Sequence, residues 1–141
     1  MSVKPLSFYF SVKDPEFTSY TTVVSDKPDN YISHTFVRCP IYNYSDKMIG
    51  YKVSDDYIQQ VGPNKYIVRL NNTYYIEEDG IGSISWQAVF LNDKPEIYYP
   101  VNVEVASNII STTDKYFGLK GTVSLFPKED GSRYVNVTFN V

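Results

Sequence analysis

The segment LSFYFSVK, residues 6–13, alternates apolar side chains with more polar ones, starting at Leu6. This period of two is typical of a β-strand with one drier face. The segment SISWQAVFL, residues 83–91, has the same alternation, starting at Ile84. Both segments predict strands of an all-β protein.

Turn-forming Gly, Pro, Asn and Asp residues divide the rest of the chain into similar short segments. Residues 41–47 have the composition of a loop, and the pair Cys39–Pro40 is expected to end the strand that precedes this loop. Only Ser54–Val61 has the spacing of a short helical turn. We expect strands over residues 6–12, 18–24, 31–37, 48–53, 65–76, 83–91, 97–110, 121–126 and 133–141. The expected fold is a single domain, residues 1–141, forming one antiparallel β-barrel of about eight strands, because closure removes the exposed sheet edges.

Composition excludes several functional classes. The chain has 141 residues, a net charge of −3 and a pI of about 5.1, so it lacks the basic footprint of a nucleic-acid-binding protein. No apolar stretch reaches the roughly 18 residues of a membrane span, and no signal peptide is recognisable. The single cysteine, Cys39, favours a reducing compartment. We therefore expect a cytoplasmic or virion-associated protein; the usage of Asn, Lys, Ile and Tyr is typical of an AT-rich genome, such as that of a large virus or a protist.

Aromatic residues are abundant, with fourteen Tyr and eight Phe, and several are adjacent in the chain. Examples are Phe8–Tyr9–Phe10, Tyr74–Tyr75 and Tyr98–Tyr99. Adjacent side chains of a strand point to opposite faces, so these strands are apolar on both. One face can fill the barrel while the other contacts another subunit, which predicts a homo-oligomer, a trimer or a dimer. Alternatively, the tyrosine hydroxyls reach water.

The C-terminal two-thirds of the chain carries a recognisable series of motifs. GIGSISWQ at residues 80–87 is followed by IISTTDKYFGLKGTVSL at residues 109–125, and DKMIG at residues 46–50 precedes both. Their order resembles the allene oxide cyclase and dirigent family of β-barrels. The resemblance implies an antiparallel eight-stranded barrel, often trimeric. Gly118 and Gly121 belong to the motif and are expected where the backbone needs freedom or close approach.

The resemblance does not carry over a catalytic residue. Aligning the first strand places Ser11 where the cyclases have a glutamate, and Lys13 where they have an asparagine. Dirigent proteins use acidic and Arg groups in their pocket, for which Arg69, Glu104 and Arg133 are candidates without a motif match. If Ser11 faces the lumen, Ser7 and Tyr9 do too, and Phe8 and Phe10 face outward; the opposite orientation also remains open. The candidate ligand-binding residues in the lumen are Ser7, Tyr9, Ser11, Arg69 and Trp86.

Other reactive side chains have simpler interpretations. His34 has no recognisable partner for general-base chemistry, and Cys39 is expected to be a small buried side chain. Trp86 could stack on a ligand ring, but its place in an alternating strand favours the core. Carboxylates at 55–56 and 77–79 could hold calcium, but the first pair lacks the spaced ligands of a calcium loop and the second group has the composition of a solvated turn. We predict no metal site and no cofactor.

The sequence therefore favours a non-enzymatic β-barrel. It would serve self-assembly or would bind a small apolar or aromatic ligand in its lumen. One alternative is a dirigent- or cyclase-like enzyme that steers a reactive intermediate by shape. Another is a carbohydrate-binding β-sandwich.

Overall fold

The computed structural model describes residues 4–97 and 100–140, and these form nine β-strands without a helix. All strand pairs are antiparallel, and the sheet order is β1-β9-β8-β7-β6-β5-β4-β3-β2. The strands are β1 (Leu6–Ser11), β2 (Thr18–Lys27), β3 (Asn30–Tyr42), β4 (Met48–Gly62), β5 (Lys65–Ile76), β6 (Gly82–Asn92), β7 (Val105–Asp114), β8 (Lys120–Pro127) and β9 (Ser132–Asn140). Among the described residues, no helix could cross a membrane.

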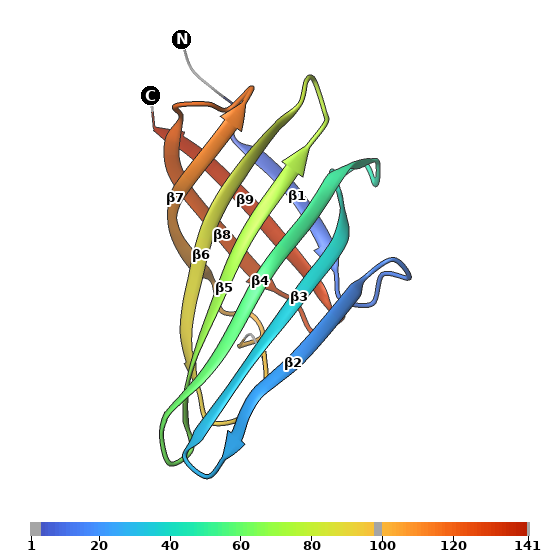
Figure 1. Ribbon diagram of the computed structural model, residues 1–141. Helices are drawn as coiled ribbons and strands as arrows, with labels where there is room; N and C mark the ends of the chain where they lie inside the picture. The colour runs from blue at the N-terminus through green and yellow to red at the C-terminus, as the bar shows by residue number, and fades with distance from the viewer. Residues whose placement is uncertain (1–3, 98–99, 141) are drawn as a thin grey trace.

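A further pairing between β1 and β3 closes the sheet into a barrel of eight strands. β2 is left outside this ring, on the edge of β3 (Figure 1). The all-β fold and the antiparallel barrel expected from the alternation of side chains are thus confirmed. Strands β2 to β6 extend beyond β1, β8 and β9 at the lower end in Figure 1, opposite both termini.

Side chains hold the seam between β1 and β3, where the backbone register contains the single pair Tyr9 and Tyr42. The two rings stack with centroids 5.5 Å apart. The Tyr9 hydroxyl donates to Asp46 at 2.6 Å, and the Tyr42 hydroxyl donates to Asp14 at 2.9 Å. The bond to Asp46 raises the pKa of Tyr9 to about 12, and burial followed by the bond to Asp14 raises that of Tyr42 to about 12. Both phenols therefore remain donors at neutral pH.

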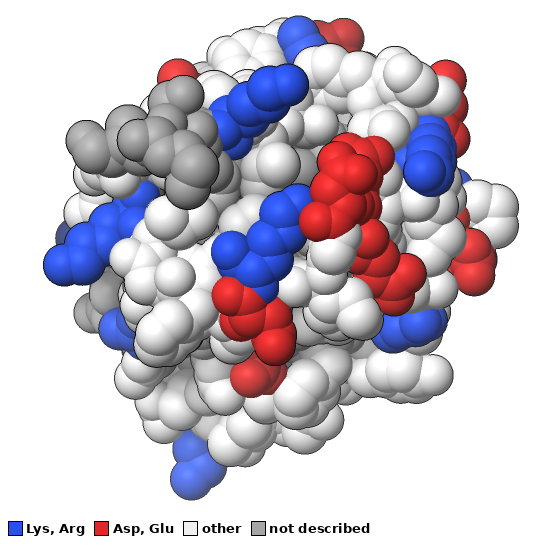
Figure 2. All heavy atoms as spheres, turned by 90° about the horizontal axis from the view of Figure 1, so that it is seen from above, with Lys and Arg blue, Asp and Glu red and all other residues white. Residues whose placement is uncertain are grey.

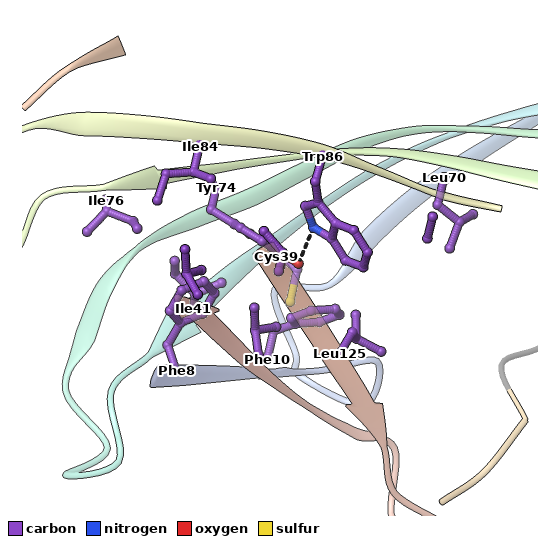
Figure 3. Close-up of a cluster of buried hydrophobic side chains, with 14 of the residues drawn as sticks. Phe8, Phe10, Cys39, Ile41, Leu70, Tyr74, Ile76, Ile84, Trp86 and Leu125 are labelled. Carbon is purple, nitrogen blue, oxygen red and sulfur yellow. Dashed lines mark hydrogen bonds between the residues drawn. The ribbon is translucent and has the colours of Figure 1, made fainter. Parts of the chain in front are cut away.

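The core fills the barrel with side chains from all its walls (Figure 3). Trp86 is 1% exposed, and its Nε1 donates to the Tyr74 hydroxyl at 2.9 Å. Phe8 packs edge-on against Tyr74, with ring centroids 4.9 Å apart. Cys39 is fully buried, as expected, and burial raises the pKa of its thiol to about 11. The close-up shows these groups converging from strands distant in sequence.

Two expectations about local structure are wrong. Ser54–Val61 forms no helical turn: it belongs to β4, which runs to Gly62. The pair Cys39–Pro40 does not end β3, which continues to Tyr42. Pro40 is tolerated because it falls between the last residue pairing with β2, Arg38, and the pairing of Tyr42 with β1. On that edge of β3 no strand is paired at Pro40, so a missing donor interrupts no ladder, while on the other edge Pro40 is in register with Tyr51 of β4.

The segment expected to be one strand over residues 97–110 is divided. Its second part is in β7, which starts at Val105. Its first part belongs to the connection between β6 and β7, and Tyr98 and Tyr99 lie outside the described residues, as does Val141 at the end of the last expected strand. In this connection Asn102 has a φ of 62°, a left-handed conformation that interrupts an extended chain. Ile97 packs against the core instead of joining the sheet.

Candidate functional site

A cavity of about 340 Å³ lies at the end of the barrel where β2, β3 and β4 face the β6–β7 connection. Its volume is within the range of small-molecule sites, roughly 300–1,000 Å³. Pro95, Glu96 and Ile97 of the connection cover one side. The other walls are formed by Phe10, Val12, Phe17, Ser19, Thr21, Tyr31, Ser33, Thr35, Val37, Lys52, Asp56, Ile58 and Arg133.

Strand β4 places three polar side chains inside the barrel. Lys52, Ser54 and Asp56 occupy alternate positions, so all three share the inward face. Their exposed fractions are 4%, 6% and 3%. β-strand geometry separates these positions by roughly 6–7 Å along the chain, which places their side chains in a row.

Hydrogen bonds connect the row. The Lys52 Nζ donates to the Ser54 Oγ at 2.8 Å, and the Ser54 hydroxyl donates to the Asp56 Oδ2 at 3.1 Å. The other carboxylate oxygen, Asp56 Oδ1, is buried and has no hydrogen-bond partner among the described residues. An unpartnered buried acceptor is costly, so this oxygen is suited to receive a ligand donor.

Burial moves both charged groups towards their neutral forms. It raises the pKa of Asp56 to about 6, although Lys52 and the Ser54 hydrogen bond oppose the shift. It also lowers the pKa of the Lys52 amine, against the opposing effect of Asp56, and Arg133 adds to the lowering. Such displaced values are typical of functional sites, where an acid or an amine must change protonation near neutral pH.

Apolar and aromatic side chains surround this polar row. Phe10, Val37 and Ile58 are buried members of the cavity wall, and Phe17 and Tyr31 are partly buried. The cavity therefore combines an apolar wall with a few polar groups on one strand, the usual composition of a small-molecule site.

The structure gives the opposite orientation of β1 from the one used to choose lumen residues. Phe8 and Phe10 are buried in the core, at 0% and 2% exposure, so Ser7, Tyr9 and Ser11 are on the outer face. The Ser7 hydroxyl donates to Asn136 at 2.7 Å on that face. Burial of two large rings outweighs the placement that the family alignment suggested.

Arg69 also faces outward, because it alternates with the buried Val68 and Leu70. Trp86 is inside the barrel but packs in the core and does not line the cavity. Of the other two candidates, Arg133 lines the cavity, whereas Glu104 is exposed.

His34 lies outside the cavity, on the outer face of β3. Its Nε2 is 2.7 Å from the Asp55 Oδ1, and its ring stacks on Tyr57 with centroids 4.2 Å apart. Asp55 and Asp56 point to opposite faces of β4, so they cannot chelate one ion together. Within the described part of the chain, no three His, Cys, Asp or Glu side chains gather as a metal site.

The end of the barrel near the termini has mixed charge. Figure 2 shows acidic and basic side chains next to each other on this face. The Lys115 Nζ donates to the Glu78 backbone carbonyl at 3.2 Å. This face therefore has no field of a single sign.

Three solved structures are similar to this chain over nearly its whole length. A pyocyanin demethylase has 11% identity and a TM-score of 0.65, with coverage of 97% of this chain and 100% of that one. A pterocarpan synthase dirigent protein has 14% identity and a TM-score of 0.56, with coverage of 96% and 84%. An exo-specific intermolecular Diels-Alderase has 16% identity and a TM-score of 0.57, with coverage of 97% and 98%. No protein-family model and no curated protein sequence matches the chain.

These likenesses establish the fold. The barrel is of the type found in a dirigent protein, in agreement with the resemblance of the sequence motifs. At such low identity the chemistry of those proteins is not transferred.

Sequence reasoning missed the polar row on β4. The sequence pattern places Lys52 in a short strand that ends at residue 53, Ser54 in a helical turn, and Asp56 beside Asp55 as a possible calcium ligand. The available signal was the spacing of Lys52, Ser54 and Asp56 at every second position, which places them on one face once residues 48–62 form a single strand.

Proposed function

We propose that the barrel binds a small, largely apolar or aromatic ligand in the cavity between β2, β3, β4 and the β6–β7 connection. The observation that carries this proposal is the cavity of about 340 Å³ with an apolar and aromatic wall and a buried polar row. The apolar wall would supply most of the affinity, and Lys52 and Asp56 would orient the polar end of the ligand.

A neutral fluorescent dye, N-phenylnaphthylamine, provides the test. We expect its emission to rise on binding to the folded protein and to saturate at one dye per chain. Ser19→Trp introduces a large side chain at the cavity rim on β2 and should weaken binding by roughly tenfold or more. Thr18→Trp is the matched control, because the adjacent side chain points to the other face of the same strand.

Equal dye affinity in the two variants would contradict the proposal. So would the absence of saturable binding to the wild-type protein. Circular dichroism in the far ultraviolet shows whether each variant keeps its β-structure.

Self-association is a second candidate, and the outer wall of the barrel supports it. Tyr20, Phe36 and Leu91 project from this wall and are 71%, 53% and 78% exposed. Tyr20 and Phe36 are paired across β2 and β3, next to the free edge of β2, and Leu91 lies further along the sheet on β6. Exposed apolar side chains next to an unpaired strand edge favour contact with a second copy of the chain.

A further inference from the structure

The amino group of Lys52 lies inside the barrel, although the binding of an apolar ligand does not need a buried amine. Its side chain is 4% exposed, yet it lines the cavity, so small molecules reach it from inside the barrel. Its hydrogen-bond acceptor is the Ser54 Oγ at 2.8 Å, and the Phe10 ring centroid is 5.2 Å away. The neighbouring inward positions are Cys39 on β3 and Tyr74 on β5. This is a poor environment for an ammonium ion, which has three protons to donate.

Burial favours the neutral form of Lys52, whereas the charges around it act in both directions. Burial and the guanidinium of Arg133 both lower the pKa of the amine. Asp56 opposes this effect, but it is connected to Lys52 through the Ser54 hydroxyl. A neutral lysine amine has a free electron pair and is a nucleophile, as in enzymes that form imines with carbonyl compounds.

We propose that Lys52 forms a reversible imine with a small aromatic or apolar aldehyde that enters the cavity. This inference rests on the proposed binding of such ligands. It adds their reactive group, a carbonyl, and the residue that captures it.

The row on β4 contains the groups that the reaction needs. The Lys52 Nζ attacks the carbonyl carbon, a C–N bond forms, and the π electrons move to the oxygen. A proton from the nitrogen passes through the Ser54 hydroxyl to the Asp56 carboxylate. The Asp56 carboxyl group then protonates the oxygen, which becomes a hydroxyl group. The second proton of the nitrogen follows the same route to this hydroxyl, the C–O bond breaks, the C=N bond forms and water leaves.

The balance is one aldehyde and one amine giving one imine and one water. Both amine hydrogens end on the departing oxygen, and Ser54 and Asp56 return to their starting states. The unpartnered Asp56 Oδ1 is the group suited to contact that oxygen during the transfer. No electrons are exchanged with another reagent in forming the imine.

Reductive trapping tests the capture. The protein is incubated with naphthaldehyde and sodium cyanoborohydride, which converts an imine into a stable secondary amine. Peptide mass spectrometry then measures labelling at Lys52 and at the exposed Lys65 of the same molecule. We expect Lys52 to be labelled at least roughly tenfold faster, because an exposed lysine is almost wholly protonated at neutral pH.

Variants separate the roles of the three residues. Lys52→Met keeps an unbranched side chain and removes the amine, so it should abolish the rapid label. Asp56→Asn removes the acid–base group and should slow trapping roughly 100-fold. Arg38→Lys, which adds an amine on the outer face, should leave the label at Lys52 unchanged.

The outcomes distinguish the imine from ligand binding itself. If the dye binds but Lys52 is labelled no faster than Lys65, imine formation is refuted and the binding proposal stands. If neither the dye binds nor Lys52 reacts, both proposals fail. The comparison of two lysines within the wild-type protein remains decisive even if Lys52→Met does not fold.

Discussion

Asp56 illustrates how one buried carboxyl group makes stability depend on pH. Its pKa is about 6 in the folded protein, compared with an ordinary value of 3.8. Between these two values the folded chain binds more protons than the unfolded chain. The free energy of unfolding contributed by this group therefore increases as pH falls through the window, and it is lost as pH rises towards 6 and above.

We expect Asp56→Asn to remove this dependence. Relative to the variant, the wild-type protein should gain about 2 kcal/mol of unfolding free energy between pH 6 and pH 3.8, since the Asp56 carboxyl group binds a proton more tightly in the folded chain across this window. Urea unfolding at both ends of the window measures the difference. Asp93→Asn, which removes an exposed carboxylate, is the control and should behave as the wild type. A parallel pH profile for wild type and Asp56→Asn would contradict the assignment.

Tyr74 shows the cost of removing one buried hydrogen-bond partner. Tyr74→Phe should reduce the free energy of unfolding by about 1–3 kcal/mol, because it leaves the buried indole N–H of Trp86 without its acceptor. Chemical denaturation followed by the fluorescence of Trp86 measures both the stability and the changed environment of the indole. Tyr44→Phe removes a hydroxyl from an exposed ring and should have little effect. Equal stability of the two variants would mean that the indole finds another acceptor.

Strands β8 and β9 approach each other too closely for a side chain at Gly121. A Cβ at this position would collide with the backbone carbonyl oxygen of Thr138 on β9. Gly118, in the turn before it, has a φ of 81° and open space around it. The two glycines of the motif thus serve different needs, close approach at one and backbone freedom at the other.

Gly121→Ala should separate the two strands and lower the free energy of unfolding by about 1–3 kcal/mol. Gly62→Ala is the control, since the nearest atoms to its added Cβ are 3.6 Å away on the flexible side chain of Lys65. Thermal unfolding together with hydrogen exchange of the β8 and β9 amides measures the effect. Unchanged exchange in Gly121→Ala would show that the strands absorb the extra carbon without separating.

The exposed apolar side chains on the outer wall of the barrel predict that the protein forms an oligomer. We expect native mass spectrometry to give the mass of a dimer or trimer, because Tyr20, Phe36 and Leu91 leave a large apolar surface in water. Phe36→Glu should shift the distribution to the monomer by placing a charge in that surface. Lys65→Glu, at the exposed start of β5, should not. A monomeric wild-type protein at every concentration would contradict self-association.

The same measurement detects a small molecule retained from the cell. A ligand bound at one per chain and lost in Ser19→Trp would support the cavity as its site. The two properties are independent, since the cavity lies inside the barrel and the apolar surface lies on its outer wall.

The alternation of side chains was sufficient to predict the fold class, because it is a local property of a strand. Strand β6 shows this most clearly, with Ile84, Trp86 and Ala88 all inside the barrel as their spacing predicted. The resemblance of the C-terminal motifs agrees with the barrel that the dirigent protein also has. These features depend on residues close together in the chain.

The second part of β4, from Ser54 onwards, was predicted as a helical turn and not as a strand for a physical reason. The inward positions of β4 include Lys52, Ser54 and Asp56, while Val53 and Tyr57 face outward, so its hydrophobic pattern is reversed. Hydrophobic periodicity identifies a strand by apolar side chains on its inward face, so it does not identify a strand whose inward face is polar. A functional site needs polar groups that are buried, and sequence-pattern rules for secondary structure fail most often where polar side chains are buried.

Residues adjacent in the chain therefore sufficed for most of the strands and for the expectation of a closed sheet. Other features required the complete barrel. They are the face that each strand turns inward, the seam between Tyr9 and Tyr42, and the cavity that joins the polar side chains of β4 to the β6–β7 connection. Strand formation follows from a local period of two. The cavity depends on contacts between segments far apart in sequence, and those contacts exist only when the sheet has closed and the large aromatic side chains have filled its core.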